Sequence, residues 1–187
     1  MPDISTLTKG SELFSASLPD VYLFVCTGNT CRSPMAAALF NALWPRRGVA
    51  ASAGLAASGS PISVNARLAL ERHGIEATPT NDYPAHVSRP VSGEIIRAAS
   101  RVYAISRRHQ LALIASFPEY AEKIFVLPAD IDDPYGGDLA TYEACLCEIE
   151  AALRAEFGAP DGEDGSGSDR DGSGSGGPGG AGGEDSK

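Results

Sequence analysis

The stretch "VYLFVCTGNTCRSPMAAALFNALW", residues 21–44, decides the fold. Its first residues, 21–25, are apolar and rich in β-forming side chains, which predicts a short buried strand. Residues 33–44 carry apolar side chains at helical spacing, and Ser33 followed by Pro34 suits the first turn of a helix. The sequence therefore predicts a strand and a helix that are joined by one short polar loop.

The alternation of strand and helix continues along the chain. We expect further strands over 48–53, 101–105 and 123–127, and helices over 63–74, 92–99, 106–117 and 139–157. This alternation is typical of an α/β fold, in which helices cover both faces of a parallel sheet. Ligands bind beyond the carboxyl ends of the strands in such a sheet, and Cys26 follows the end of the first strand.

Composition separates three segments. We expect a loosely ordered N-terminal extension over 1–19, one domain over 20–157 and a disordered C-terminal tail over 158–187. The tail holds 12 of the 21 glycines, and its apolar side chains are two alanines. Such a segment buries too little surface to offset the entropy that is lost on ordering.

The same composition argues against several classes of protein. No apolar run approaches the roughly 20 residues that cross a bilayer, and the first residues lack the features of a secretory signal. We therefore expect no membrane association and a cytoplasmic location. The formal net charge is −9, without a basic stripe, which argues against nucleic acid as a partner. The four cysteines lack the spread spacing of a secreted disulfide framework.

The polar loop has the residues of an anion site. Backbone N–H groups of a strand-to-helix loop converge, and the helix N-terminus adds partial positive charge. Gly28 allows a backbone conformation that a Cβ disfavours, and the guanidinium of Arg32 can hold two phosphate oxygens. The residues that we expect around the anion are Thr27, Gly28, Asn29, Thr30, Cys31 and Ser33.

Cys26 lies in the same electrostatic field. A helix N-terminus and a neighbouring arginine favour the thiolate, which is the nucleophilic form of cysteine. A thiolate that faces a bound phosphorus centre predicts a cysteinyl-phosphate intermediate, which water then hydrolyses. We expect the hydroxyls of Ser33 and Thr27 to donate hydrogen bonds to the sulfur, and Asn29 to brace the loop.

A second motif supplies the acid that a departing oxygen or nitrogen needs. It is "PADIDDPYGGD", residues 128–138, which follows the last predicted strand and is therefore expected at the same edge of the sheet. Asp133 is the candidate acid, and Tyr135 is expected to form a wall of the pocket. The rivals of Asp133 on the same loop are Asp130, Asp132 and Asp138.

Four segments together resemble one enzyme family. The segments "VCTGNTCRSPMAAALF" (25–40), "SAGL" (52–55), "HVSRP" (86–90) and "DDPYGGD" (132–138) look like the low-molecular-weight protein tyrosine phosphatases. The resemblance runs from Val21 to Phe157. It implies a four-stranded parallel sheet flanked by helices, a phosphorylated protein as substrate, and no metal or other cofactor. It also implies that Cys26 is the nucleophile, Arg32 binds the phosphate, and Asp133 donates the proton and later activates water.

Two substrate classes stay open. Tyrosine-directed members of the family commonly carry a bulky aliphatic residue before the second loop cysteine, where this chain has Thr30. The form "CTGNTCRSPMA" resembles the bacterial protein-arginine phosphatases, and a hydroxyl in the pocket wall can orient a polar guanidinium. Tyr135 instead offers an aromatic wall that suits phosphotyrosine. We therefore expect a phosphatase that acts on phosphotyrosine or on phosphoarginine.

Two other functions compete with this one. Thioredoxin-coupled arsenate reductases share this fold and a similar loop, but they need a further redox cysteine pair in the middle of the chain. No cysteine lies between Cys31 and Cys145, so that pair is absent from the sequence. A phosphate-binding module without turnover would not need the nucleophile, the arginine and the acid together.

The second loop cysteine and the three histidines have simpler interpretations. Cys31 could simply pack against the sheet, but because it shares one tight loop with Cys26, we expect the two cysteines to form a reversible disulfide under oxidation. We expect His73 and His109 on the surfaces of their helices, and His86 in support of a neighbouring loop.

Overall fold

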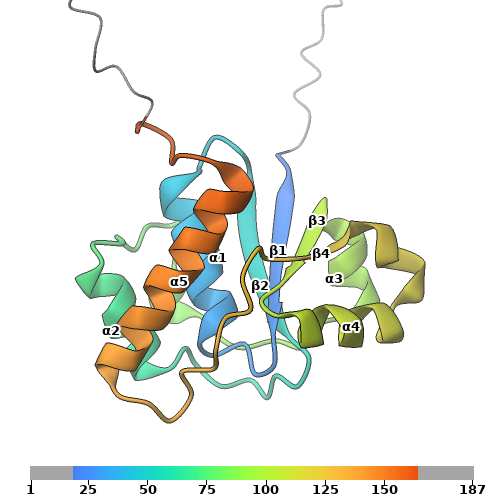
Figure 1. Cartoon of the computed structure of the whole chain (residues 1–187), viewed down its shortest axis with the longest axis horizontal. Helices are drawn as coiled ribbons and strands as arrows, with labels where there is room; N and C mark the ends of the chain where they lie inside the picture. The colour runs from blue at the N-terminus through green and yellow to red at the C-terminus, as the bar shows by residue number, and fades with distance from the viewer. Residues whose placement is uncertain (1–18, 164–187) are drawn as a thin grey trace, which may run out of the picture.

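A computed structural model describes residues 19–163 (Figure 1). Residues 1–18 of the predicted N-terminal extension and residues 164–187 of the predicted tail lie outside the described residues. Within the described part, no helix is both long enough and apolar enough to cross a membrane.

The sheet has the predicted architecture. Its strands are β1 (Val21–Cys26), β2 (Val49–Gly54), β3 (Arg101–Ala104) and β4 (Ile124–Val126). All neighbours pair in parallel, in the order β2-β1-β3-β4, which confirms the four-stranded parallel sheet of an α/β fold. Because β1 is an inner strand, the residues that follow it are flanked by the ends of β2 and β3.

Helices cover both faces of the sheet (Figure 1). One side holds α1 (Arg32–Leu43), α2 (Val64–Arg72) and α5 (Leu139–Phe157), and the other side holds α3 (Gly93–Ala98) and α4 (Arg107–Ser116). Side chains of β1 alternate between two cores: Phe24 packs with α1 and α5, whereas Leu23 and Val25 pack with α3 and α4. Two 3₁₀ helices, Tyr83–Ala85 and Pro118–Lys123, were not predicted.

The start of α1 differs from its predicted position. The helix begins at Arg32, and Cys31 occupies the position before it, so Ser33 lies within the first turn. The Ser33 side chain is buried and bonds toward the loop and the sheet rather than along its own helix. Arg32 is therefore the first residue of the helix, and the Ser33 hydroxyl points toward the interior of the loop.

The predicted tail also begins too early. Trp44 Nε1 donates to the carbonyl oxygens of Gly158 at 3.2 Å and Ala159 at 3.1 Å, and the N–H of Asp161 donates to Leu43. Residues 158–163 are thus fixed to the end of α1 by hydrogen bonds that a count of glycines does not reveal. Both ends of the described chain lie at the edge of the sheet opposite to the β1–α1 loop (Figure 1).

Candidate active site

The loop between β1 and α1 is held against the end of β2. Cys26 is the last residue of β1 and is in register with Gly54, the last residue of β2. A Cβ on Gly54 would lie 2.6 Å from the carbonyl oxygen of Thr27 and 2.9 Å from the Cβ of Asn29. The glycine of the "SAGL" segment is therefore required by the close approach of the loop backbone.

The Cys26 sulfur is buried and faces two hydrogen-bond partners. Its Sγ lies 3.0 Å from the Ser33 hydroxyl, and the backbone N–H of Asn29 donates to it at 3.3 Å. Both groups can donate to a thiolate, and the adjacent N-terminus of α1 adds positive potential. The predicted contact with Ser33 is therefore confirmed, and Asn29 supplies a second donor through its backbone.

Asn29 fixes the shape of the loop through its backbone conformation and its side-chain hydrogen bonds. It has a positive φ of 56°, a conformation that asparagine tolerates better than most residues. Its side-chain amide donates to Ser33 and Ser52, each at 2.9 Å, and its Oδ1 accepts from the backbone N–H of Arg89 at 3.0 Å. Asn29 was expected to brace the loop by bonding the loop backbone. Its side chain instead bonds to the side chains of Ser33 and Ser52 and to the backbone of the distant Arg89, so it fixes the loop to other segments.

Arg32 connects the loop to the predicted acid. Its guanidinium is buried, with Nη1 donating to the carbonyl oxygen of Ile131 at 3.1 Å and Nη2 to Oδ2 of Asp133 at 2.6 Å. The Nε–H of Arg32 is buried and has no hydrogen-bond partner among residues 19–163. A buried donor without a partner is costly, so this N–H is available for an anion in the neighbouring pocket.

These residues surround one pocket with a volume of about 210 Å³. Asp133 and Tyr135, which the sequence predicted for the site, line the same cavity as the loop. They follow the loop by more than a hundred positions in the sequence. Tyr135 also lines the pocket but is 79% exposed, so its role as a wall of the pocket stays a prediction. The lining residues are Cys26, Thr27, Gly28, Thr30, Cys31, Arg32, Asp133 and Tyr135.

The rivals of Asp133 have other surroundings. Asp138 caps α5 by accepting the N–H of Thr141 at 2.9 Å, and Asp130 accepts the N–H of Arg107 at 3.3 Å. Asp132 is exposed and does not line the pocket. Asp133 is therefore the member of the acidic loop that reaches the cavity.

Cys31 is buried beside the loop but contacts α5. Its Sγ lies 3.3 Å from the hydroxyl of Tyr142 and 3.5 Å from that of Ser63. Cys26 and Cys31 are both free thiols in this structure, so the proposed reversible disulfide stays a prediction. Burial raises the pKa of the nearby Cys145 to about 12, so that thiol is not a competing nucleophile.

One residue of the site was predicted wrongly. His109, expected on the surface of its helix, is 1% exposed and contacts the loop from α4. Its Nε2 lies 2.9 Å from Thr27 Oγ1, and its Nδ1 lies 2.7 Å from Ser106 Oγ. The Thr27 hydroxyl thus pairs with His109, and not with the Cys26 sulfur as expected. The sequence offered one clue to this contact. Ser106, three residues before His109, was predicted to cap the helix, which places the histidine in the first turn.

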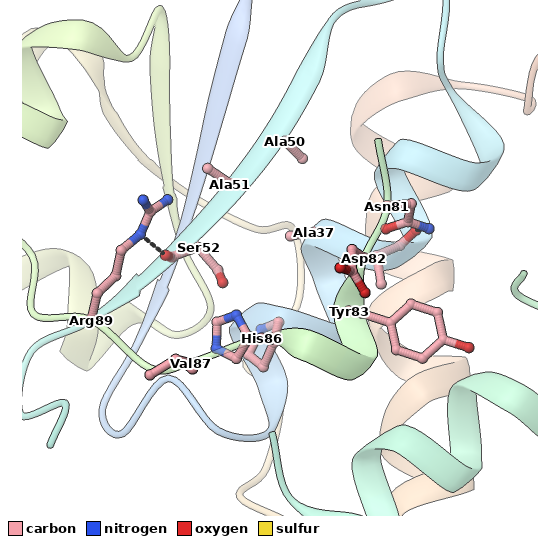
Figure 2. Close-up of a pocket in the computed structure, with 12 residues that line it drawn as sticks. Ala37, Ala50, Ala51, Ser52, Asn81, Asp82, Tyr83, His86, Val87 and Arg89 are labelled. Carbon is pink, nitrogen blue, oxygen red and sulfur yellow. Dashed lines mark hydrogen bonds between the residues drawn. The ribbon is translucent and has the colours of Figure 1, made fainter. Parts of the chain in front are cut away.

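A second cavity lies between α1, β2 and residues 81–89 (Figure 2). Side chains from β2 and the segment after the first 3₁₀ helix line it, among them Ser52, His86 and Arg89. His86 Nε2 lies 2.8 Å from the carbonyl oxygen of Asn29, and Arg89 Nε donates to the carbonyl oxygen of Ser52 at 2.9 Å. The expectation that His86 supports a neighbouring loop is therefore confirmed.

Within the described residues, no group of three His, Cys, Asp or Glu side chains is placed to hold a metal ion.

Comparison with known sequences identifies relatives of this chain. Residues 21–159 match the family described as low molecular weight phosphotyrosine protein phosphatase. The protein-arginine-phosphatase of Geobacillus stearothermophilus is 40% identical over 144 residues, which cover 73% of this chain and 93% of the relative. Low molecular weight protein-tyrosine phosphatase A of Mycobacterium tuberculosis is 30% identical over 141 residues, which cover 70% of this chain and 85% of the relative.

Comparison with solved structures also finds a phosphatase with a similar fold. A mutant of the YwlE arginine phosphatase with a phosphorylated active-site serine matches the fold with a TM-score of 0.65 at 34% identity. The match covers 72% of this chain and 91% of that chain.

Proposed function

Because the chain belongs to the low molecular weight phosphotyrosine protein phosphatase family, we propose that Cys26 attacks the phosphorus of a phosphorylated protein side chain. The observation that carries this proposal is the buried Cys26 sulfur, which faces the Ser33 hydroxyl and the N–H of Asn29 beside the unpaired Nε–H of Arg32. Cys26 and Arg32 both line one small pocket, and attack on a bound phosphoryl group needs a nucleophile and a hydrogen-bond donor placed together in this way.

The reaction has two steps. In the first step the thiolate forms a bond to phosphorus as the bond to the substrate oxygen or nitrogen breaks, and Asp133 gives its proton to the departing atom. In the second step water attacks the cysteinyl-phosphate, Asp133 takes the proton, and the thiolate leaves with the help of the Ser33 hydroxyl. In the YwlE mutant a serine that replaces an active-site cysteine is phosphorylated, which supports a phosphoenzyme intermediate on Cys26.

We infer that the substrate is phosphoarginine in a protein. Thr30 gives the pocket a small wall with a hydroxyl, and a relative with 40% identity is named a protein-arginine-phosphatase. A guanidinium carries several N–H donors, which a hydroxyl acceptor can orient and an aliphatic branch cannot. Phosphotyrosine is the second candidate, because the exposed ring of Tyr135 at the pocket mouth suits a phenyl group.

The arsenate reductase alternative has no support. The relatives are named phosphatases, and this chain lacks a cysteine between Cys31 and Cys145 for a redox relay. A reaction that depends on a reduced Cys26 suits a reducing compartment, so we also propose a cytoplasmic location.

The first experiment tests the nucleophile. Purified protein is expected to hydrolyse p-nitrophenyl phosphate without added metal, and Cys26→Ser is expected to reduce turnover to background. Cys147→Ser, which changes an exposed cysteine outside the pocket, is the matched control and should keep wild-type activity. Robust activity in Cys26→Ser would overturn the proposed nucleophile.

The second experiment tests the substrate class. Wild-type protein and Thr30→Ile are compared on phosphoarginine and phosphotyrosine peptides of the same sequence. We expect the wild type to prefer phosphoarginine, and Thr30→Ile to shift the ratio of kcat/KM values toward phosphotyrosine by about tenfold or more. Thr80→Ile makes the same change at an exposed site outside the pocket and should leave the ratio unchanged. A wild type that prefers phosphotyrosine, with no change in Thr30→Ile, would overturn the phosphoarginine assignment.

A further inference from the structure

A chain of three side chains reaches the loop from α4. Ser106 Oγ lies 2.7 Å from His109 Nδ1, and His109 Nε2 lies 2.9 Å from Thr27 Oγ1. Ser106 and His109 are buried, whereas Thr27 is exposed and lines the candidate active-site pocket. The reaction proposed above assigns no role to His109, although this buried histidine contacts the residue next to the nucleophile.

The direction of these hydrogen bonds follows from what Ser106 already accepts. Ser106 caps α4, and its Oγ accepts the backbone N–H of His109 at 3.4 Å. The hydroxyl hydrogen of Ser106 then has one partner in the described structure, which is His109 Nδ1. Because a buried hydroxyl hydrogen without a partner is costly, Ser106 donates to Nδ1.

The proton of His109 is therefore on Nε2. Burial, together with the positive charges of Arg32 and Arg108, lowers the pKa of His109 to about 4, so the ring is neutral near pH 7 and carries one proton. With Nδ1 as the acceptor, Nε2–H donates to Thr27 Oγ1. The hydroxyl hydrogen of Thr27 consequently points away from His109 and is free to donate into the pocket.

We propose that His109 is a positioning residue that orients the Thr27 hydroxyl. In this orientation the hydroxyl donates a hydrogen bond to a non-bridging oxygen of the phosphoryl group. This inference rests on the proposed function, because it assigns a further donor to the same reaction. A donor to a phosphoryl oxygen contributes most in the transition state, where charge accumulates on the oxygens around phosphorus. His109 acts only through Thr27 and does not itself reach the substrate.

The test is a double-mutant cycle with two readouts, turnover of p-nitrophenyl phosphate and inhibition by vanadate, an analogue of the transition state. Thr27→Val removes the hydroxyl with little change of shape at an exposed position, so folding is preserved. We expect it to lower kcat/KM and to weaken vanadate inhibition, each by about tenfold. His109→Leu is expected to lower both about fivefold, and the double variant should be no worse than Thr27→Val alone.

Rescue variants separate positioning from packing. His109→Gln keeps an N–H donor near the Nε2 position and should recover most of the loss seen in His109→Leu. Thr27→Ser keeps a hydroxyl and should exceed Thr27→Val by at least about threefold. His73→Leu, which replaces the histidine that follows α2 and is paired with Glu150, is the matched control and should leave both readouts unchanged.

The outcomes distinguish the inference from the proposed function. Losses in His109→Leu and Thr27→Val that multiply in the double variant would overturn the inference, because they would show that the two residues act independently. Wild-type vanadate inhibition in Thr27→Val would overturn it as well, with the proposed function intact. Absence of turnover in the wild type, or full turnover in Cys26→Ser, would overturn the proposed function first.

Discussion

Arg32 Nη2 and Asp133 Oδ2 lie 2.6 Å apart, so the arginine and the acid of the proposed reaction form an ion pair across the pocket. The Arg32 side chain is 5% exposed and the Asp133 side chain 48% exposed. An ion pair with one half-exposed partner contributes little net stability, so a phosphoryl group can replace Asp133 on the guanidinium. Substrate binding would thereby release the carboxyl group next to the departing atom.

Asp133→Asn is expected to separate catalysis from anion binding. The amide cannot donate a proton as a carboxylic acid does, so kcat with a phosphotyrosine or phosphoarginine peptide should fall about a hundredfold or more. Vanadate should inhibit the variant at least as well as the wild type, because Arg32 loses its competing carboxylate. Steady-state kinetics and vanadate titration measure the two effects.

The neighbouring aspartate provides the control for this prediction. Asp132→Asn makes the same chemical change at an exposed residue that does not line the pocket, and its kcat should equal that of the wild type. Equal losses in the two variants would indicate an electrostatic effect of the loop as a whole and would contradict the assignment of Asp133 as the acid.

Gly54→Ala is expected to displace the loop. The new Cβ would lie 2.6 Å from a backbone oxygen of Thr27, which cannot move without moving the residue next to Cys26. We expect a loss of stability of about 1–3 kcal/mol and a loss of kcat/KM of about tenfold or more. Thermal unfolding and turnover measure these losses.

Gly93→Ala is the matched control for that variant. Gly93 lies in α3, where the nearest atom to a new Cβ is on Tyr120 at 3.8 Å. Alanine suits a helix better than glycine, so the variant should be as stable as the wild type or more stable by about 0.5–1 kcal/mol, with unchanged turnover. A Gly54→Ala protein with normal turnover would show that the loop tolerates the added atom.

Much of the fold was predictable because its signals are local. Each strand or helix signal, such as the apolar run 21–25 or the helical spacing of 33–44, lies within one short segment. The alternation of strands and helices along the chain then favours a parallel sheet. The convergence of Cys26, Arg32 and Asp133 on one pocket was predictable because their motifs follow strands, and the ends of parallel strands meet at one edge.

The missed features depend on contacts between distant segments. His109 stands among polar residues in "SRRHQ", so nothing local indicates that the loop 82 positions earlier buries it. The path of residues 158–163 depends similarly on Trp44, which lies 114 positions before its partner Gly158. Tertiary contacts of this kind override composition, and a single sequence does not display them.

Asn29→Ala is expected to loosen the loop and to reduce turnover. The substitution removes the buried bonds to Ser33, Ser52 and Arg89, and alanine is disfavoured at a positive φ. We expect a loss of about 2–3 kcal/mol in the free energy of unfolding and a large fall in kcat. Denaturant unfolding and turnover with p-nitrophenyl phosphate measure both effects.

Asn41→Ala is the control for a general loss of amide bonds. The Asn41 side chain makes two hydrogen bonds to the backbone of Ala50, away from the pocket. This variant should lose about 1–2 kcal/mol of stability while its folded fraction keeps wild-type kcat. A kcat in Asn29→Ala equal to that in Asn41→Ala would contradict a specific role of Asn29 in shaping the loop.

The buried histidine also makes stability depend on pH. The ordinary pKa of histidine is 6.5, and burial together with Arg32 and Arg108 lowers that of His109 to about 4, against the opposing charges of Asp133 and Asp130. Between these two values the unfolded chain binds a proton that the folded chain does not bind. The stabilising contribution is therefore complete above pH 6.5 and is lost as the pH falls toward 4.

Comparison of the wild type with His109→Gln isolates this contribution. Burial also lowers the pKa of His86, but His86 is present in both proteins, so its contribution cancels in the difference. We expect the wild type to lose about 3 kcal/mol more than the variant as the pH falls from near neutrality to about 4. Urea unfolding across that range measures the free energy of unfolding for each protein. Parallel curves for the two proteins would mean that His109 takes up a proton as readily in the folded chain as in the unfolded one, which its contacts with Ser106 and Thr27 should prevent.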